Sequence, residues 1–267
     1  MTGADTDITP RAVLRRLVDG SRERAEPLRP HLDRLVEHCA TMAPVRSLGT
    51  ALRQPGMSVI AEVKRRSPSA GPIAPDLDAV ALARAYRAGG AAAVSVLTEP
   101  DGFGAWPADL PAVARYADLP TLRKDFVVEA AQVWETRAMG ADAVLLIVAI
   151  LDEGALAGLL TAARGAGLEA LVEAHTEAEV AAAVDAGANI VGVNNRDLGT
   201  FAVDLAIAER LRAAIPDDVV TVAESGMSSP AAAARMADAG YDAILVGEAA
   251  SRAADPAGFV ASLRTAR

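Results

Sequence analysis

Residues 141–173 read ADAVLLIVAILDEGALAGLLTAARGAGLEALVE, and the order of apolar and helical segments in them indicates the fold class. An apolar run at Ala143–Val148 predicts a strand that is covered on both faces. Leucines and alanines then recur at helical spacing over Glu153–Arg164, and Gly167 follows as a helix C-terminal cap. A second apolar run at Leu168–Val172 predicts the next strand. The stretch therefore predicts one strand–helix–strand unit with parallel strands.

The same unit recurs along the chain. Apolar or β-branched runs predict eight strands, over Ser58–Val63, Ala93–Leu97, Thr121–Leu122 leading into Phe126–Val128, Ala143–Val148, Leu168–Val172, Ile190–Val193, Val219–Ala223 and Ala243–Val246. Helical patterns lie between them at Asp78–Ala88, Glu129–Met139, Glu153–Arg164, Glu177–Ala186, Leu205–Ala214 and Pro230–Ala239. Successive strand ends are about 26 residues apart, which suits one strand, one helix and two short loops. We therefore predict a (β/α)8 TIM barrel, with a doubly wound open sheet as the alternative.

Residues 1–56 precede the first predicted strand. Thr9 can cap a helix that has Pro10 at its first position. Two apolar stripes follow, the first formed by Val13, Leu14, Leu17 and Val18 and the second by Leu32, Leu35 and Val36. We expect these helices to pack on the barrel as a lid or plug. Because no Gly/Ser-rich linker follows them, we predict a single domain, with residues 1–56 as a helical extension and residues 57–267 as the barrel.

Composition excludes several classes of function. The chain has 267 residues, 52% of them apolar, and a net charge of −9, which argues against disorder, non-specific nucleic-acid binding and an anionic membrane partner. The single cysteine, Cys39, excludes an intrachain disulfide, and the three histidines lack metal-ligand spacing. The acidic Met1–Pro10 lacks a secretory signal pattern, and the longest apolar run, Ala143–Leu151, is about half of a membrane span. We therefore expect a cytoplasmic protein without a metal.

Charged and polar residues gather where the predicted strands end. In barrels of this type the loops after the carboxyl ends of the strands form the active site. Six of the eight strands end in such residues, namely Glu62 with Lys64, Arg123–Asp125, Glu173, Asn194–Asp197, Glu224 and Glu248. Glycines at positions 226 and 247 follow the last two strands, where such barrels bind phosphate through backbone N–H groups. Solvated strand ends and ordinary tight turns are the alternative interpretations of these features.

These segments, in this order, resemble the indole-3-glycerol phosphate synthase family of tryptophan biosynthesis. The matching segments are Ile60–Ser69, Val94–Glu99 with Phe103–Gly104, Leu122–Phe126, Ala141–Ile147, Ala170–Glu173, Gly192–Leu198 and Val222–Gly226. The resemblance implies a lyase that needs no metal or organic cofactor. Its substrate would be 1-(o-carboxyphenylamino)-1-deoxyribulose 5-phosphate, and its products indole-3-glycerol phosphate, carbon dioxide and water. Other enzymes of the tryptophan pathway are the macromolecular partners that the resemblance suggests.

The resemblance also implies roles for individual residues. Lys124 would be a general acid toward the carbonyl or the departing hydroxyl, Lys64 a second lysine near phosphate and substrate, and Glu173 the proton-transfer partner for dehydration. The division of acid duty between the two lysines stays open. The resemblance further implies that Glu62 orients the lysines, that Asn194 lies at the reacting centre and that Glu224 lies near the substrate. The anthranilate group would contact Ser67 and Arg196 through its carboxylate and Phe103 through its ring. The phosphate would be bound by Ser225, Gly226, Gly247 and the backbone of Glu248.

Burial and like charge would lower the pKa of these lysines toward neutrality, with the neighbouring glutamates opposing that change. Glu248 stands where many relatives carry Ser, so we expect its side chain to point away from the phosphate. The loop Pro100–Trp106 also departs from the family's pattern. Three alternatives stay open: a phosphoribosylanthranilate isomerase type of barrel, a non-catalytic or redirected phosphate-binding barrel, and a synthase copy that serves a specialised indole pathway.

Overall fold

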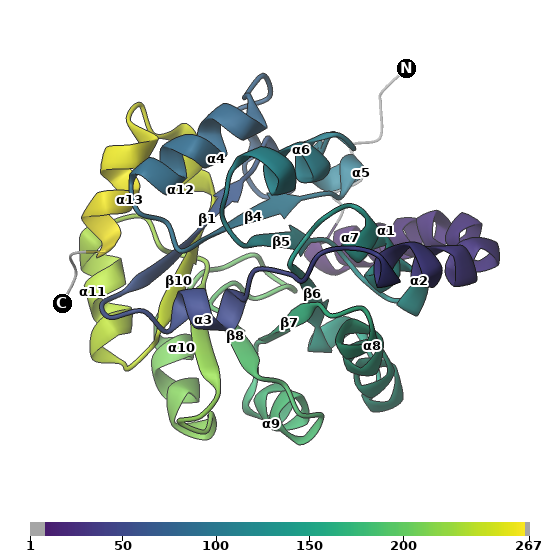
Figure 1. Ribbon diagram of the computed structural model, residues 1–267. Helices are drawn as coiled ribbons and strands as arrows, with labels where there is room; N and C mark the ends of the chain where they lie inside the picture. Colours follow the sequence, from purple (N-terminus) through teal and green to yellow (C-terminus); the bar gives the residue numbers. More distant parts are fainter. Residues whose placement is uncertain (1–8, 265–267) are drawn as a thin grey trace, which may run out of the picture.

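The computed structural model describes residues 9–264, so residues 1–8 of the predicted extension and 265–267 of the predicted barrel lie outside the described residues. Eight parallel strands close into a barrel in which β1 pairs with both β4 and β10 (Figure 1). The strands are β1 (Ser58–Val63), β4 (Ala93–Leu97), β5 (Thr121–Lys124), β6 (Ala143–Ile147), β7 (Glu169–Ala174), β8 (Ile190–Asn194), β9 (Val220–Glu224) and β10 (Ala243–Val246). The predicted (β/α)8 barrel is confirmed, and the open sheet is wrong.

Helices surround the barrel (Figure 1). They are α4 (Ala79–Ala88), α6 (Asp109–Tyr116), α7 (Ala130–Ala138), α8 (Glu153–Gly165), α9 (Glu177–Asp185), α10 (Ala206–Leu211), α11 (Pro230–Asp238) and α13 (Pro256–Arg264). Shorter elements are α5 (Pro100–Phe103), α12 (Glu248–Arg252), the 3-10 turns η1 (Glu26–His31), η2 (Val148–Ile150) and η3 (Arg212–Ala214), and the hairpin β2 (Arg66–Ser67) with β3 (Gly71–Pro72). All six predicted helices are present, whereas α6 and the last two helices were not predicted.

One predicted strand segment is wrong. Phe126–Val128 is not a continuation of β5, which ends at Lys124. The carboxylate of Asp125 accepts the backbone N–H of Phe126 at 2.9 Å, and the side chain of Gln132 accepts the N–H of Val128 at 2.9 Å. Side chains thus take the backbone donors that a neighbouring strand would need, and the segment becomes a loop leading into α7.

The hydrophobic core has two parts, one between the strands and the helices and one inside the barrel, and this division explains why polar residues meet at one end of the barrel. Alternate residues of each strand face the helices or the interior, because strand side chains have a period of two. In β1, Val59, Ala61 and Val63 pack toward the helices, whereas Ile60 belongs to the interior cluster. Two positions farther along the same side lies Glu62. The pairs Leu122 with Lys124, Leu171 with Glu173 and Val222 with Glu224 repeat this arrangement on β5, β7 and β9.

The N-terminal extension forms both a lid and a plug. Helix α1 (Pro10–Ala25) begins with the predicted Thr9 cap and contributes Val13, Leu14 and Leu17 to the cavity at the carboxyl ends of the strands. The short α3 (Leu48–Leu52) was not predicted, and its two leucines complete the interior core of the barrel.

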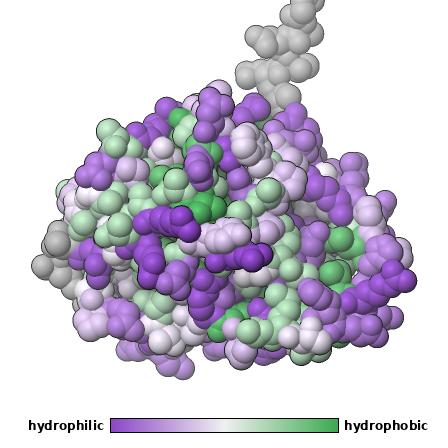
Figure 2. Space-filling model, turned by 45° about the horizontal axis from the view of Figure 1, so that its top comes forward, coloured by the Kyte–Doolittle hydropathy of each residue, from purple (hydrophilic) through white to green (hydrophobic). Residues whose placement is uncertain are grey.

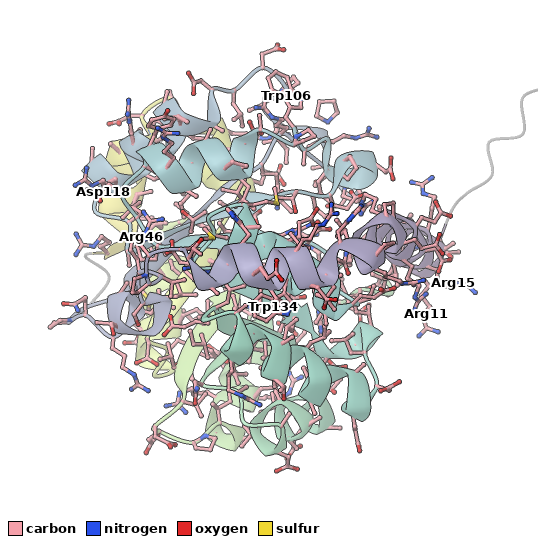
Figure 3. The ribbon with its side chains drawn as sticks, turned by 45° about the vertical axis from the view of Figure 1, so that its right-hand side comes forward. Arg11, Arg15, Arg46, Trp106, Asp118 and Trp134 are labelled. Atoms are coloured by element: carbon pink, nitrogen blue, oxygen red, sulfur yellow. The ribbon has the colours of Figure 1, made fainter. Side chains whose placement is uncertain are left out.

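Helix α2 (Leu32–Ala40) packs against α7 outside the barrel. Figure 3 brings this side forward, with Trp134 of α7 next to the N-terminal helices and Arg11 and Arg15 pointing into solvent from α1. Val36 of the second predicted stripe is exposed, and Cys39 is the buried residue of α2.

The outer surface carries apolar side chains scattered among hydrophilic ones (Figure 2). The exposed large apolar residues of the described chain are Val36, Trp106, Tyr116 and Val203, which come from separate elements. No helix within residues 9–264 is both long and apolar enough to cross a membrane.

Candidate active site

A cavity of about 480 Å³ lies at the carboxyl ends of the strands, a volume within the usual range for small-molecule sites. All thirteen residues that the sequence suggested for the site line it, which are Glu62, Lys64, Ser67, Phe103, Lys124, Glu173, Asn194, Arg196, Glu224, Ser225, Gly226, Gly247 and Glu248. The structure thus brings together residues spread over most of the barrel sequence. Their contacts divide them into a charged floor, an apolar wall and a rim of loops.

The floor is centred on Lys124, which bridges two carboxylates. Its Nζ lies 2.9 Å from Glu173 Oε2 and 3.3 Å from Glu224 Oε2. Burial acts to lower the pKa of Lys124, but the charges of Glu173, Glu224 and Glu62 outweigh it and raise that pKa well above the ordinary value. The expected fall of this lysine pKa toward neutrality is therefore wrong, because three carboxylates face the ammonium group. Lys124 is a protonated side chain at neutral pH.

The two carboxylates around Lys124 differ in charge state. Burial acts to raise the pKa of Glu173, but Lys124 and His175 hold it below its ordinary value, with a hydrogen bond from Asn194 Nδ2 at 3.0 Å. For Glu224, burial and the charge of Glu173 prevail over Lys124 and raise the pKa to about 7. Glu173 is therefore ionised at neutral pH, whereas Glu224 titrates there.

The second lysine has its own carboxylate. Lys64 Nζ lies 2.6 Å from Glu62 Oε1, and its side chain is 18% exposed against 1% for Glu62. Both side chains line the cavity, and Lys64 is the more accessible of the two. A Cβ at Gly247 would lie 2.3 Å from Glu62 Oε1, and a Cβ at Gly192 would lie 2.2 Å from Glu224 Oε1. Glycine at both positions leaves room for a buried carboxylate, a reason for Gly247 that sequence reasoning missed.

The wall is apolar and includes two aromatic rings. Phe103 and Phe126 lie with their ring centroids 6.4 Å apart, and Lys64 Nζ lies 6.0 Å from the Phe103 centroid. Leu14 and Leu17 of α1 line the same cavity. The wall can therefore hold a flat aromatic group close to the lysines.

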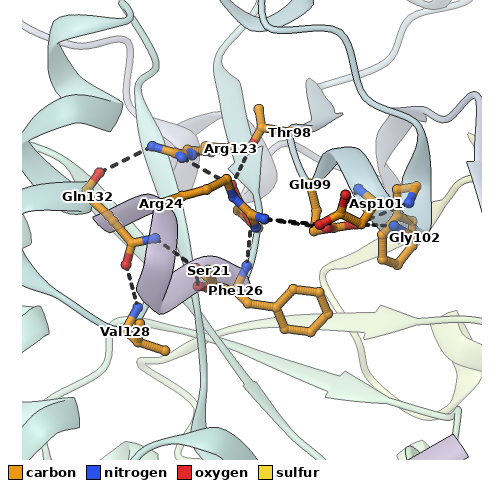
Figure 4. Close-up of polar contacts among 12 residues, drawn as sticks. Ser21, Arg24, Thr98, Glu99, Asp101, Gly102, Arg123, Phe126, Val128 and Gln132 are labelled. Carbon is orange, nitrogen blue, oxygen red and sulfur yellow. Dashed lines mark hydrogen bonds and ion pairs between the residues drawn. The ribbon is translucent and has the colours of Figure 1, made fainter. Parts of the chain in front are cut away.

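A polar network missed by sequence reasoning ties the lid to this wall (Figure 4). Glu99 is fully buried and accepts three backbone N–H groups at the start of α5, the helix that ends at Phe103. Arg24 of α1 lies 3.7 Å from Glu99 and 3.8 Å from Asp125. Ser21 of α1 donates to the backbone carbonyl of Phe126. Both loops that carry the aromatic rings are thereby linked to α1.

The remaining polar residues form part of the rim. Asn194 Oδ1 accepts the backbone N–H of Arg196 at 3.0 Å, and Arg196 Nη1 donates to the carbonyl of Phe201 at 3.0 Å. These bonds hold the β8–α10 loop beside the cavity. Ser67 Oγ accepts the N–H of Ala70 at 3.1 Å, so this hydroxyl also holds its own hairpin.

The loops after β9 and β10 present backbone N–H groups. Ser225 and Gly226 both have positive φ, 62° and 81°, which turns the chain sharply after Glu224. Successive residues in such turns can form an anion-binding concavity. After β10, the short α12 begins at Glu248, whose carboxylate lies 3.3 Å from Arg252 Nε. The Glu248 charge is therefore paired with Arg252 within its own helix.

The family model and the curated relatives agree on one family. Residues 14–263 match the family model described as indole-3-glycerol phosphate synthase. The chain is 52% identical over 224 residues to indole-3-glycerol phosphate synthase 2 of Streptomyces coelicolor, covering 84% of this chain and 86% of that protein. It is 49% identical to the synthase of Streptomyces griseus, over 94% of both chains, and 48% identical to that of Micrococcus luteus, over 96% of this chain and 98% of that protein.

Among solved structures, thiamine phosphate pyrophosphorylase from Pyrococcus furiosus is similar with a TM-score of 0.61 at 18% identity, covering 82% of this chain and 97% of that one. This likeness concerns the fold alone.

Proposed function

Since the chain belongs to the indole-3-glycerol phosphate synthase family, we propose that the Lys124–Glu173–Glu224 cluster is the centre at which it catalyses that family's reaction. The enzyme is a carboxy-lyase of tryptophan biosynthesis, which converts 1-(o-carboxyphenylamino)-1-deoxyribulose 5-phosphate into indole-3-glycerol phosphate, carbon dioxide and water. The observation that carries the assignment of the centre is a protonated lysine held between two buried carboxylates of opposite protonation tendency.

Ring closure needs a cation at the substrate C2 carbonyl. An aromatic carbon attacks C2 as negative charge develops on the carbonyl oxygen, and the Lys124 ammonium donates a proton to that oxygen. The raised pKa of Lys124, caused by the carboxylates around it, keeps the proton in place until the oxygen becomes basic. Carbon dioxide then leaves, and the ring regains its aromatic character.

Dehydration needs one proton delivered and one removed. A lysine protonates the C2 hydroxyl, which leaves as water, and Glu173 accepts the proton that the ring system loses. The contact of 2.9 Å between Lys124 and Glu173 then allows this proton to pass from the carboxyl to a neutral Lys124 amine. The second proton that the lysines donate is recovered from solvent, because loss of carbon dioxide from a carboxylate consumes one proton in each turnover. In this scheme Lys64, which lines the cavity, is the second candidate for the acid, and Glu62 fixes its position.

Substrate orientation is assigned to the wall and the rim. Phe103 flanks the anthranilate ring, and Arg196 with Ser67 binds its carboxylate, to which a guanidinium can donate two hydrogen bonds. Asn194 orients Glu173 at the reacting centre. The phosphate is assigned to Ser225, Gly226, Gly247 and the N–H of Glu248, all of which line the cavity. The positive φ of Ser225 and Gly226 supports this assignment.

We further propose that extension and barrel form a single domain and that the reaction takes place in the cytoplasm. Packing of the α3 leucines into the interior of the barrel supports the first statement, and the buried free thiol of Cys39 is compatible with the second. Other enzymes of the pathway remain the proposed protein partners, in addition to the sugar phosphate.

The proposed function is tested by a fluorescence assay. Purified protein is mixed with 1-(o-carboxyphenylamino)-1-deoxyribulose 5-phosphate in the presence of a chelator, and indole emission is followed. We expect a saturable rise in rate with substrate concentration. A flat trace with tight binding of the compound would instead indicate a non-catalytic barrel. A flat trace without binding would indicate a site redirected to another phosphate ester.

Replacing Glu248 by glutamine is expected to change KM by less than about twofold, because the carboxylate is half exposed and paired with Arg252 while only its backbone N–H is assigned to phosphate. Steady-state kinetics in the same assay measure this, with Arg252→Gln as the control that removes the other member of the pair. A fall in KM of tenfold or more in the Glu248→Gln variant would contradict the assignment, because it would show that the carboxylate repels the phosphate.

A further inference from the structure

His175 is a largely buried titratable side chain that the proposed mechanism leaves without a role. It follows the last residue of β7 and lies two positions after Glu173, so it faces the same side of the strand. Its side chain is 10% exposed, and it does not line the cavity. The imidazole therefore lies behind the proposed proton acceptor, outside the lining of the cavity.

The ring lies between two carboxylates. Nδ1 is 3.2 Å from Glu179 Oε2, and Nε2 is 3.5 Å from Glu173 Oε1. Nε2 is buried and has no hydrogen-bond partner among residues 9–264, so Glu173 is the acceptor toward which it is directed. A neutral imidazole has only one N–H, whereas an imidazolium donates from both nitrogens. Two carboxylates within ion-pair distance of the ring, one at each nitrogen, favour the charged form.

Glu179 holds the ring in this orientation. The same Oε2 that faces Nδ1 accepts the backbone N–H of His175 at 2.8 Å. Glu179 belongs to the first turn of α9, where its own N–H donates to Thr176 Oγ1 at 3.2 Å. Backbone hydrogen bonds thus hold both His175 and Glu179 in place, which leaves the imidazole little freedom to turn away from Glu173.

Charge balance favours a proton on His175. The groups that face or influence it are Glu173 on β7, Glu179 on α9, Glu224 on β9 and Asp197 in the β8–α10 loop, with Lys124 on β5 beyond Glu173. Burial acts to lower the pKa of His175, but the hydrogen bond to Glu179 and the charges of the glutamates raise it above its ordinary value. A third cation beside Lys64 and Lys124 therefore offsets the excess of buried carboxylates.

We propose that His175 is a positioning residue of the active site, which is clamped by Glu179 and, as an imidazolium, keeps Glu173 ionised and oriented for proton transfer. This inference rests on the proposed function. With Asn194 and His175 on Oε1, the other carboxylate oxygen stays on Lys124. The positive charge of the imidazolium thereby offsets the repulsion between an ionised Glu173 and the neighbouring Glu224.

Removal of this cation is expected to change the pKa of Glu173 in one direction. A positive charge close to a carboxylate favours its ionised form, so its loss raises the pKa of Glu173. Below that pKa the carboxyl cannot accept a proton, and the acidic limb of the kcat profile moves to higher pH. KM is expected to stay within about twofold, since His175 does not line the cavity.

The test uses His175→Gln, His175→Lys and Glu179→Gln in the full chain, with Glu177→Gln as a matched control that removes an exposed carboxylate from the same helix turn. Titration of the Glu173 carboxyl carbon by 13C NMR, without substrate, gives its pKa directly; the signal is identified by its loss in Glu173→Gln. We expect a rise of about one pH unit in His175→Gln and recovery in His175→Lys, which restores the charge. The imidazole pKa of His175 itself should fall in Glu179→Gln and stay unchanged in Glu177→Gln.

The pH dependence of kcat is the second measurement that tests the role of His175. In His175→Gln the acidic limb should shift upward by the same amount, with KM nearly constant. An unchanged Glu173 pKa, or a kcat lowered equally at every pH without recovery in His175→Lys, would overturn the inference in favour of a packing role. If the wild-type protein fails to turn over the substrate, the proposed function is wrong, whereas the NMR titration still decides the link between His175 and Glu173.

Discussion

Replacing Lys124 by methionine is expected to lower kcat by about 1,000-fold, the central range for a lost general acid. Methionine fills much of the same volume but has no proton to donate to the C2 oxygen. It also removes the cation that Glu173 and Glu224 share at 2.9 and 3.3 Å. Both carboxyl pKa values should then rise, because burial is no longer opposed by the ammonium charge. The fluorescence assay gives kcat, and circular dichroism shows whether the fold persists.

Lys124→Arg is the matched control for this prediction. Arginine keeps the positive charge between the two carboxylates but holds its proton far too tightly to act as an acid. We therefore expect a folded protein with low kcat. High activity in Lys124→Arg would show that the cation acts only by polarising the carbonyl, and more than about a tenth of wild-type kcat in Lys124→Met would remove Lys124 from its proposed role.

A change of stability with pH should accompany the loss of Lys124. In Lys124→Met the folded-state pKa of Glu173 would lie above its unfolded value, so the carboxyl destabilises the fold once pH exceeds the unfolded value. Acidification then protonates the carboxyl and returns stability to the variant. Wild-type Glu173 has the opposite sign, since its pKa is depressed in the folded state and its contribution is lost as the pH falls. Thermal unfolding of the Met variant should therefore be compared between pH 5.5 and 7.5.

The barrel and the position of the charged floor could be predicted because both depend on local regularities. Apolar runs at a regular interval specify parallel strands, and the period of two places Glu62 above Ile60 and Glu173 above Leu171 inside the same barrel. The strand ends thus indicated where charged side chains gather, and the resemblance to the family selected those of the site, whereas Arg123 from the same set of strand ends bonds Glu135 of α7 and does not line the cavity. The apolar Phe126–Val128 misled the same reasoning, because side-chain hydrogen bonds from Asp125 and Gln132 replaced the strand ladder there.

What the sequence could not provide depends on contacts between distant segments. Arg24 meets Glu99 only because α1 crosses the top of the barrel, and no local pattern records that path. The direction of the Lys124 pKa shift likewise depends on three carboxylates from three other strands. The spacing of two between Glu173 and His175 could have indicated that the two side chains lie close together. The contact of His175 with Glu179, in contrast, forms only when α9 packs beside the end of β7.

Replacing Glu173 by glutamine is expected to lower kcat by about 100- to 1,000-fold, with a smaller change in KM. The amide is nearly the same size and can still accept the hydrogen bond from Asn194, but it cannot accept a proton. It also removes the carboxylate whose charge raises the pKa of Lys124 most. The pKa of Lys124 should therefore fall, and the basic limb of the kcat profile should move to lower pH. Glu177→Gln, the same exchange at an exposed position on the following helix, should behave like the wild type.

The double variant Lys124→Met/Glu173→Gln decides whether the two residues act as one unit. If a proton passes between them across the 2.9 Å contact, either single change already interrupts the cycle, and the double variant should be no more than about tenfold slower than the worse single variant. Independent roles would instead multiply the two losses, to about 10⁵-fold or more. Single-turnover measurements of the three variants separate these outcomes. A multiplicative loss would mean that Glu173 returns its proton by another route and that the lysine–carboxylate contact serves only to hold the ammonium group in place.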